Sequence, residues 1–121
     1  MTIILNHTIV PTRDKAVAAR LFARLFGLAS EAGGHFATVR VNDQLTMLFD
    51  HRESFDSHHY AFHVSDAEFD AILGRVKDAG IAYGSQPGEL DNGRLNDWGG
   101  GRGVYFTDPD GHLFELMTAP Q

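Results

Sequence analysis

Two stretches of the 121-residue chain repeat one pattern, and this repeat most constrains the possible folds. His7 opens the first stretch and His59 opens the second, 52 residues later. Asp14 and Asp66 follow the two histidines at the same offset, and each precedes a helical pattern. A repeated supersecondary unit predicts similar modules that bury a shared core.

A chain of this length fits one domain, since domains usually run about 100–150 residues. No linker rich in Pro, Gly or Ser interrupts it. We therefore expect a single domain over residues 1–121, with module one at about 1–52 and module two at about 53–121.

Apolar spacing marks one helix in each module. In the first, Val17, Leu21 and Leu25 recur every fourth residue before Gly27. In the second, the i, i+3, i+4, i+7 spacing of one buried face is followed by Gly80. That face consists of Phe69, Ile72, Leu73 and Val76. Ser65 and Glu68 are spaced for a capping box at its start.

Alternating patterns after each helix predict strands. The expected strands are 35–41, 45–49, 103–107 and 112–118, with shorter ones near 29–32 and 81–84. Asp108-Pro109-Asp110-Gly111 is typical of a tight turn between the last two. Each half then reads as strand, helix and three strands. Two βαβββ modules of this kind make an α+β fold.

Composition excludes several classes of protein. The net charge of −6 disfavours nucleic acid and an anionic membrane surface as partners. No apolar run approaches the roughly 18 residues that span a bilayer, and no basic region precedes the apolar N-terminus. The chain has no cysteine, which excludes thiolate sites and disulfides. We expect a cytoplasmic protein.

Strand alternation brings three potential metal ligands to one side of the sheet. His59 lies on the face opposite the bulky Tyr60 and Phe62, and Glu115 on the face opposite Phe114 and Leu116. His7 shares its face with Leu5 and Ile9, and all three candidate ligands can point to one side of the sheet. A carboxylate in an apolar strand requires pairing or coordination, because a buried charge is costly. Two histidines and a carboxylate are typical of a metal site with open positions. Surface or core histidines without a metal are the alternative that spacing alone leaves open.

The second half resembles the vicinal oxygen chelate superfamily. The resemblance is carried by 58–62 and by 104–116, which holds Asp-Pro-Asp-Gly-His followed by Glu115. The superfamily contains glyoxalase I, the extradiol dioxygenases, methylmalonyl-CoA epimerase, the fosfomycin-resistance thiol transferases and the bleomycin-binding proteins. The resemblance implies a curved, half-barrel mixed sheet with helices on its outer face. It also implies a divalent metal ion (Fe, Mn, Ni, Zn or Co) on His7, His59 and Glu115.

One position departs from the glyoxalase I pattern of four protein ligands. Aligning 42–47 with 110–115 places Met47 where the fourth ligand would lie. A thioether is a poor ligand for a metal that prefers oxygen. The three-ligand pattern is closer to the extradiol dioxygenases and the fosfomycin enzymes.

Further residues are candidates for contact with the substrate. Tyr105 matches a pocket tyrosine of the fosfomycin enzymes and is a candidate catalytic residue together with Glu115. His63 shares the face of His59, and we assign it to substrate binding. Trp98 and Arg102 receive the same assignment. An ordinary structural role is the alternative for each of them.

Trp98 and Arg102 belong to a long segment, 85–102, with five glycines and no regular pattern. Long loops of this kind are often lids. We expect this one to border the metal site and to become ordered when a ligand binds. Packing of Trp98 on the body or on a partner subunit is the alternative.

Two functions remain open. The first is a metal-dependent enzyme, acting as an isomerase or lyase, a thiol transferase or a dioxygenase on a small molecule with adjacent oxygens. The second is a metal-free protein that binds a small molecule or drug, as bleomycin-resistance proteins do. The intact set of His7, His59 and Glu115 favours the enzyme. We also expect a homodimer, because an open sheet leaves edge strands that need cover.

Overall fold

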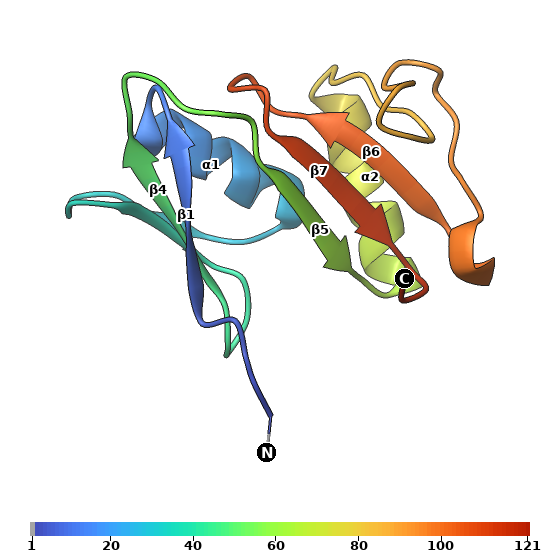
Figure 1. The fold of residues 1–121 in the computed structure, drawn as a ribbon, viewed down its shortest axis with the longest axis horizontal. Helices are drawn as coiled ribbons and strands as arrows, with labels where there is room; N and C mark the ends of the chain where they lie inside the picture. Colours follow the sequence, from blue (N-terminus) through green and yellow to red (C-terminus); the bar gives the residue numbers. More distant parts are fainter. Residues whose placement is uncertain (1) are drawn as a thin grey trace. The chain divides into compact units, whose positions relative to one another are not determined.

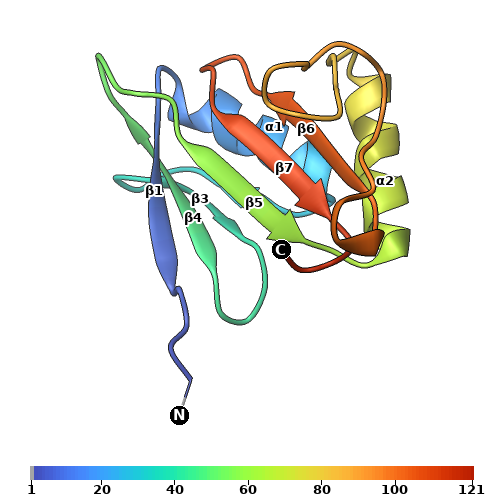
Figure 2. The ribbon, with the colours of Figure 1, turned by 45° about the vertical axis from the view of Figure 1, so that its right-hand side comes forward.

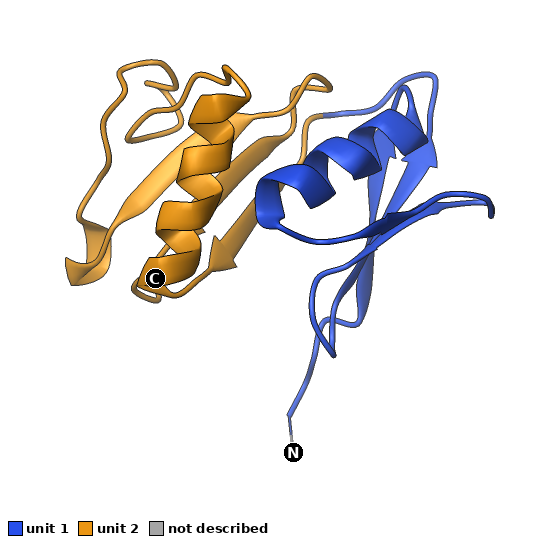
Figure 3. Cartoon of the chain, turned by 180° about the vertical axis from the view of Figure 1, so that it is seen from behind, with its two compact units in different colours: residues 1–56 blue, residues 57–121 orange. Residues whose placement is uncertain are grey.

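The computed structural model describes residues 2–121 and divides the chain into two compact units, 1–56 and 57–121 (Figure 3). Each unit has its own sheet and its own helix (Figure 1). In the described part of the chain, no helix is long and apolar enough to cross a membrane.

Unit 1 contains a four-stranded sheet in the order β1-β4-β3-β2, covered on one face by α1 (Figures 1 and 2). β1 runs parallel to β4, while β3 is antiparallel to both β4 and β2. The elements are β1 (His7–Thr12), α1 (Lys15–Phe26), β2 (Ser30–Glu31), β3 (Ala37–Arg40) and β4 (Thr46–His51).

The ends of α1 form as the sequence predicts. The Val17 amide donates to Asp14 Oδ1 over 3.2 Å, which satisfies a free donor of the first turn. Gly27 ends the helix in the left-handed conformation, at φ 70°. Val17, which marked the helix by its spacing, is 50% exposed. The buried face instead consists of Ala19, Phe22, Ala23 and Leu25.

Unit 2 contains the three-stranded sheet β5-β7-β6, with α2 over one face (Figure 1). β5 runs parallel to β7, and β6 runs antiparallel to it. The elements are β5 (His59–His63), α2 (Asp66–Asp78), the short 3₁₀ turn η1 (Trp98–Gly100), β6 (Gly103–Thr107) and β7 (Leu113–Met117). The capping box of Ser65 and Glu68 is present, and all four predicted apolar residues of α2 are buried.

The short strand expected near 81–84 reduces to a single bridge between Gly84 and Tyr105. At this bridge Gly84 lies close to the backbone of Glu89, which leaves no space for a Cβ. Two asparagines then hold the segment 85–102 in place. The Asn92 carboxamide oxygen accepts from the amides of Ser85 and Arg94, and Asn96 Nδ2 donates to the Ser85 carbonyl.

Gly84→Ala should destabilise the protein by about 1–3 kcal/mol, the usual cost of overpacking. A Cβ at this position would lie 1.7 Å from the Glu89 carbonyl oxygen, so backbone must move. Gly88→Ala is the control, since nothing lies within 4 Å of its Cβ position. Urea denaturation of both variants measures the difference in the free energy of unfolding. Equal values for the two would contradict this account of the bridge.

Candidate metal centre

The faces of the unit 2 sheet agree with the predicted alternation. His59, Ala61 and His63 lie on the exposed face of β5, while Tyr60 and Phe62 are partly buried on the other. The parallel register sets Ala61 opposite Glu115. The carboxylate therefore projects from the face that carries His59.

Glu115 is a buried carboxylate with one satisfied oxygen. Its Oε1 lies 3.1 Å from His59 Nε2, and the side chains are 4% and 48% exposed respectively. Its Oε2 is buried and has no hydrogen-bond partner. Leaving a charged oxygen buried and unpaired costs several kcal/mol. Such a group is expected where a cation or ligand completes the pairing.

Tyr105 lies directly across from Glu115, on β6. Burial raises the pKa of Tyr105 to about 12, with further contributions from a hydrogen bond to Glu115 and from its negative charge. The Tyr105 ring centroid lies 6.1 Å from that of His59. The hydroxyl therefore stays protonated at neutral pH and is available as a hydrogen-bond donor beside the carboxylate.

Trp98 covers this cluster from the loop. Its ring packs edge-on against Tyr105, with centroids 5.9 Å apart, and remains 41% exposed. The expectation that the loop borders the site therefore agrees with the contacts within unit 2. Its ordering on ligand binding stays a prediction.

The donor set of this pair fits a divalent metal ion. An imidazole nitrogen beside a carboxylate with a spare oxygen suits most first-row divalent metals. Within residues 2–121, no three His, Asp or Glu side chains gather closely enough to hold an ion. His7 belongs to unit 1, at the start of β1, where its Nδ1 lies 2.8 Å from Asn6 Oδ1. Its role as the third ligand stays a prediction.

The alignment of Met47 with Glu115 was wrong by one residue. In β1 and β4, Leu48 stands opposite Ile9, two residues after His7. Glu115 stands opposite Ala61 in the same relation to His59. Leu48 therefore occupies the equivalent position, while Met47 is buried. Leucine has no donor atom, so unit 1 still offers no fourth ligand at that position.

Two other predicted residues have partners away from the pair. His63 Nε2 lies 3.1 Å from the Thr118 carbonyl oxygen. Arg102 forms ion pairs with Asp70 at 2.7 Å and Asp66 at 3.0 Å, and its guanidinium lies 4.5 Å from the Phe69 ring centroid. These contacts hold Arg102 against α2, which covers the other face of the sheet.

Unit 1 contains a pocket that no sequence pattern predicted. It has a volume of about 350 Å³ and is lined by Ala29, Glu31, Thr38, Arg40 and Thr46. Its residues come from three strands, and only the strand register brings them together. The arrangement could have been found by noting that Thr38 and Arg40 alternate with the apolar Ala37 and Val39.

The chain is similar to known proteins in both sequence and fold. The family model for the Glyoxalase/Bleomycin resistance protein/Dioxygenase superfamily matches residues 4–116. The solved structure of "Oxidase ChaP-H2" is 40% identical, covers 99% of this chain and 96% of its own, and superposes with a TM-score of 0.92. "Oxidase ChaP-H1" is also 40% identical, covers 98% of each chain and has a TM-score of 0.91.

Curated relatives include fosfomycin-resistance proteins. Glutathione transferase FosA of Serratia marcescens is 26% identical over 93% of this chain and 78% of its own length. Fosfomycin resistance protein FosX of Mesorhizobium japonicum is 38% identical over 50% of this chain, and the match spans only 38% of that relative. Because the family model covers nearly the whole sequence, the chain belongs to the glyoxalase/bleomycin resistance protein/dioxygenase superfamily.

Proposed function

We propose that this chain is a divalent-metal-dependent enzyme that binds a small substrate through two adjacent oxygens. The ligands of the ion are His7, His59 and Glu115. The observation that carries the proposal is the buried Glu115 Oε2, which has no hydrogen-bond partner. The other oxygen of the same carboxylate, Oε1, pairs with the exposed His59. A protein that bound its ligand without a metal would have no need of this costly arrangement.

Oxidation of the substrate, with dioxygen as the electron acceptor, is the reaction that the relatives favour. The two similar oxidases are 40% identical across almost the entire chain. A second candidate, transfer of a thiol to a substrate such as fosfomycin, is supported by the likeness to FosA. When bound, a divalent ion supplies a Lewis acid that stabilises negative charge on the coordinated substrate oxygens.

The protein's own groups prepare the site around those oxygens. The protonated hydroxyl of Tyr105 donates a hydrogen bond toward charge that develops on the substrate, because burial, together with the nearby Glu115, raises its pKa to about 12. Trp98 packs edge-on against Tyr105 and covers one side of its ring. Glu115 and His59 hold each other in orientation before the substrate arrives.

Removing the anionic ligand should nearly abolish metal binding. Loss of an outer hydrogen-bond partner already costs a metal site about 10–100-fold in affinity, so Glu115→Gln should cost more than about a hundredfold. His7→Ala and His59→Ala should act similarly. Calorimetric titration of untagged protein with Mn²⁺, Fe²⁺, Co²⁺, Ni²⁺ and Zn²⁺ measures the affinities and ranks the metals.

His63→Ala is the matched control, since His63 shares the face of His59 but contacts Thr118. It should bind metal as the parent does. Parent protein that binds none of the five ions would reject the enzyme and leave the metal-free binding protein as the function.

Glu115→Gln should also lower the pKa of Tyr105 below about 12, because the variant removes the negative charge that opposes ionisation. Burial, the largest cause of the shift, remains, so the pKa should stay above the usual value of about 10. Tyrosinate absorbance, followed from pH 9 upward in a Tyr60→Phe, Tyr83→Phe background, reports Tyr105 alone. Circular dichroism marks any alkaline unfolding. If tyrosinate absorbance begins to rise at the same pH with and without Glu115→Gln, the carboxylate does not affect the pKa of Tyr105.

We further propose that the enzyme is a homodimer. β1 and β2 are edge strands of one sheet, and β5 and β6 are edge strands of the other. Ile3, Leu5 and Ile9 are exposed apolar residues on and before the β1 edge. Exposed apolar strand edges are usually covered by a partner.

Mixing two inactive variants determines whether the site is shared between subunits. If His7 of one subunit joins the pair of the other, a heterodimer of His7→Ala and Glu115→Gln contains one fully intact site. Metal binding should then return to about half of the heterodimer sites after mixing and refolding. A site within one chain would give no recovery. Sedimentation equilibrium checks the dimer itself, and a stable monomer at micromolar concentration would contradict it.

A further inference from the structure

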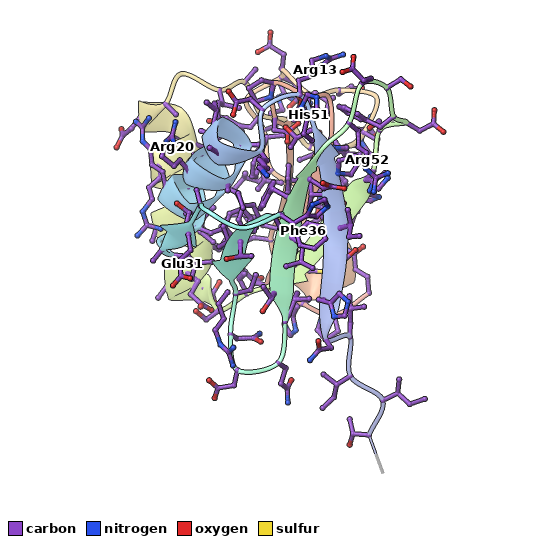
Figure 4. The ribbon with its side chains drawn as sticks, turned by 90° about the vertical axis from the view of Figure 1, so that its left-hand side faces the viewer. Arg13, Arg20, Glu31, Phe36, His51 and Arg52 are labelled. Atoms are coloured by element: carbon purple, nitrogen blue, oxygen red, sulfur yellow. The ribbon has the colours of Figure 1, made fainter. Side chains whose placement is uncertain are left out.

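The pocket of unit 1 lies on the sheet face opposite α1. Ala37, Val39, Met47 and Phe49 are buried on the helix side of β3 and β4. Thr38, Arg40 and Thr46 alternate with them and therefore face the other way. The pocket opens among these side chains, next to Glu31 of β2. Figure 4 shows Glu31 on β2 and Arg20 on α1, which covers the opposite face of this sheet.

The register places Arg40 in the same row of the sheet as His7. Thr46 stands opposite His7 on one side and opposite Arg40 on the other. Neighbouring strands lie about 4.8 Å apart, so two steps separate the backbones of His7 and Arg40 by about 10 Å. Thr46 and Arg40, which line the pocket, therefore lie in the same row of the sheet as the proposed ligand His7.

A comparison with the equivalent position of unit 2 explains why unit 1 has this opening. Thr38 stands opposite Leu48, as Tyr105 stands opposite Glu115 in unit 2. In unit 2 the large tyrosine, covered by Trp98, fills that position. In unit 1 the smaller threonine leaves about 350 Å³ open, which is the lower end of the size of ligand pockets.

The polar groups of the pocket are a cation, an anion and two hydroxyls. Arg40 Nη2 donates to the Asp43 carbonyl oxygen over 3.2 Å. In the described part of the chain, Arg40 forms no ion pair with a carboxylate, whereas Arg102 is held by two. Glu31 is exposed at the pocket and supplies an acceptor. An arginine with free donors is suited to bidentate binding of a carboxylate.

We propose that this pocket binds the far end of the substrate and that this end is a hydroxy acid. Arg40 binds its carboxylate, Glu31 accepts from its hydroxyl, and Thr38 and Thr46 complete the polar lining. The pocket assignment stands on unit 1 alone. It rests on the proposed function only for the opposite end of the substrate, whose adjacent oxygens bind the metal ion. The enzyme therefore selects substrates in which chelating oxygens and a hydroxy acid are separated by about two strand widths, roughly 10 Å.

Three catechols test this assignment, because a catechol offers two adjacent oxygens to a metal. Dihydroxyphenyllactate carries a hydroxy acid at its far end, dihydroxyphenylpropanoate carries only the acid, and propylcatechol carries neither. Each is titrated calorimetrically into Zn²⁺-loaded protein under argon, since Zn²⁺ has no redox chemistry of its own. The parent should bind dihydroxyphenyllactate most tightly.

Arg40→Gln should weaken the binding of dihydroxyphenyllactate about tenfold and leave propylcatechol unchanged. Glu31→Gln should remove the preference for dihydroxyphenyllactate over dihydroxyphenylpropanoate. Arg20→Gln is the matched control, because it removes one positive charge from α1, away from the pocket (Figure 4). The pocket assignment fails if Arg40→Gln weakens all three catechols equally, weakens none, or behaves as Arg20→Gln does.

A metal-free arm keeps this test separate from the proposed function. Nitrogen-15 spectra of metal-free parent, titrated with dihydroxyphenyllactate, should show shifts at the amides of Thr38 and Thr46 and at Arg40 Nε. The shifts at the Thr38 and Thr46 amides should vanish in Arg40→Gln. If zinc has no effect on any catechol but these shifts occur, the metal centre is wrong and the pocket stands. If catechols bind zinc-loaded protein but Arg40 has no part, the metal centre stands and the pocket is wrong.

Discussion

The buried charge of Glu115 is the constraint on which the rest of unit 2 depends. β7 is the central strand of its sheet, so a side chain at its middle is flanked on both sides, by Ala61 and by Tyr105. The small alanine leaves room for the His59 ring to reach Oε1, and burial of the tyrosine keeps its hydroxyl protonated. A carboxylate on an edge strand would be hydrated and would not need these partners. The position of one residue in the strand order thus determines the chemistry around it.

Local patterns predicted the parts of the fold that local physics decides. The repeat, the capping box, the strand 103–107 and the faces of His59 and Glu115 follow from periodicities of 3.6 and 2 residues. The alignment of Met47 failed because a shift of one residue in a strand exchanges its two faces, and pattern alone does not fix the register. The position of Leu48 emerges only when β1 and β4 are paired.

Other features depend on contacts between residues far apart in the sequence. Arg102 pairs with Asp70, 32 residues earlier, and with Asp66, and its guanidinium stacks on Phe69. No local sequence pattern indicates that these two aspartates of α2 bind the arginine. The pocket near Arg40 was missed for a related reason, since its lining joins β2, β3 and β4 through the sheet register. Residue types suited to a site can be recognised in the sequence, but the contacts that occupy them depend on the fold.

The two modules share a scaffold and differ in what they place on it. Unit 2 holds ten of the sixteen acidic residues and four of the ten basic ones, and so carries the whole net charge of −6. Unit 1 has equal numbers of both signs. An acidic unit repels an anionic substrate until a metal ion offsets its charge, and its Arg102 is already neutralised by two carboxylates. A cation that binds the anionic end of a substrate is therefore better supplied by the electrically balanced unit. Arg40, on the row of His7 and without a carboxylate partner among the described residues, meets that requirement.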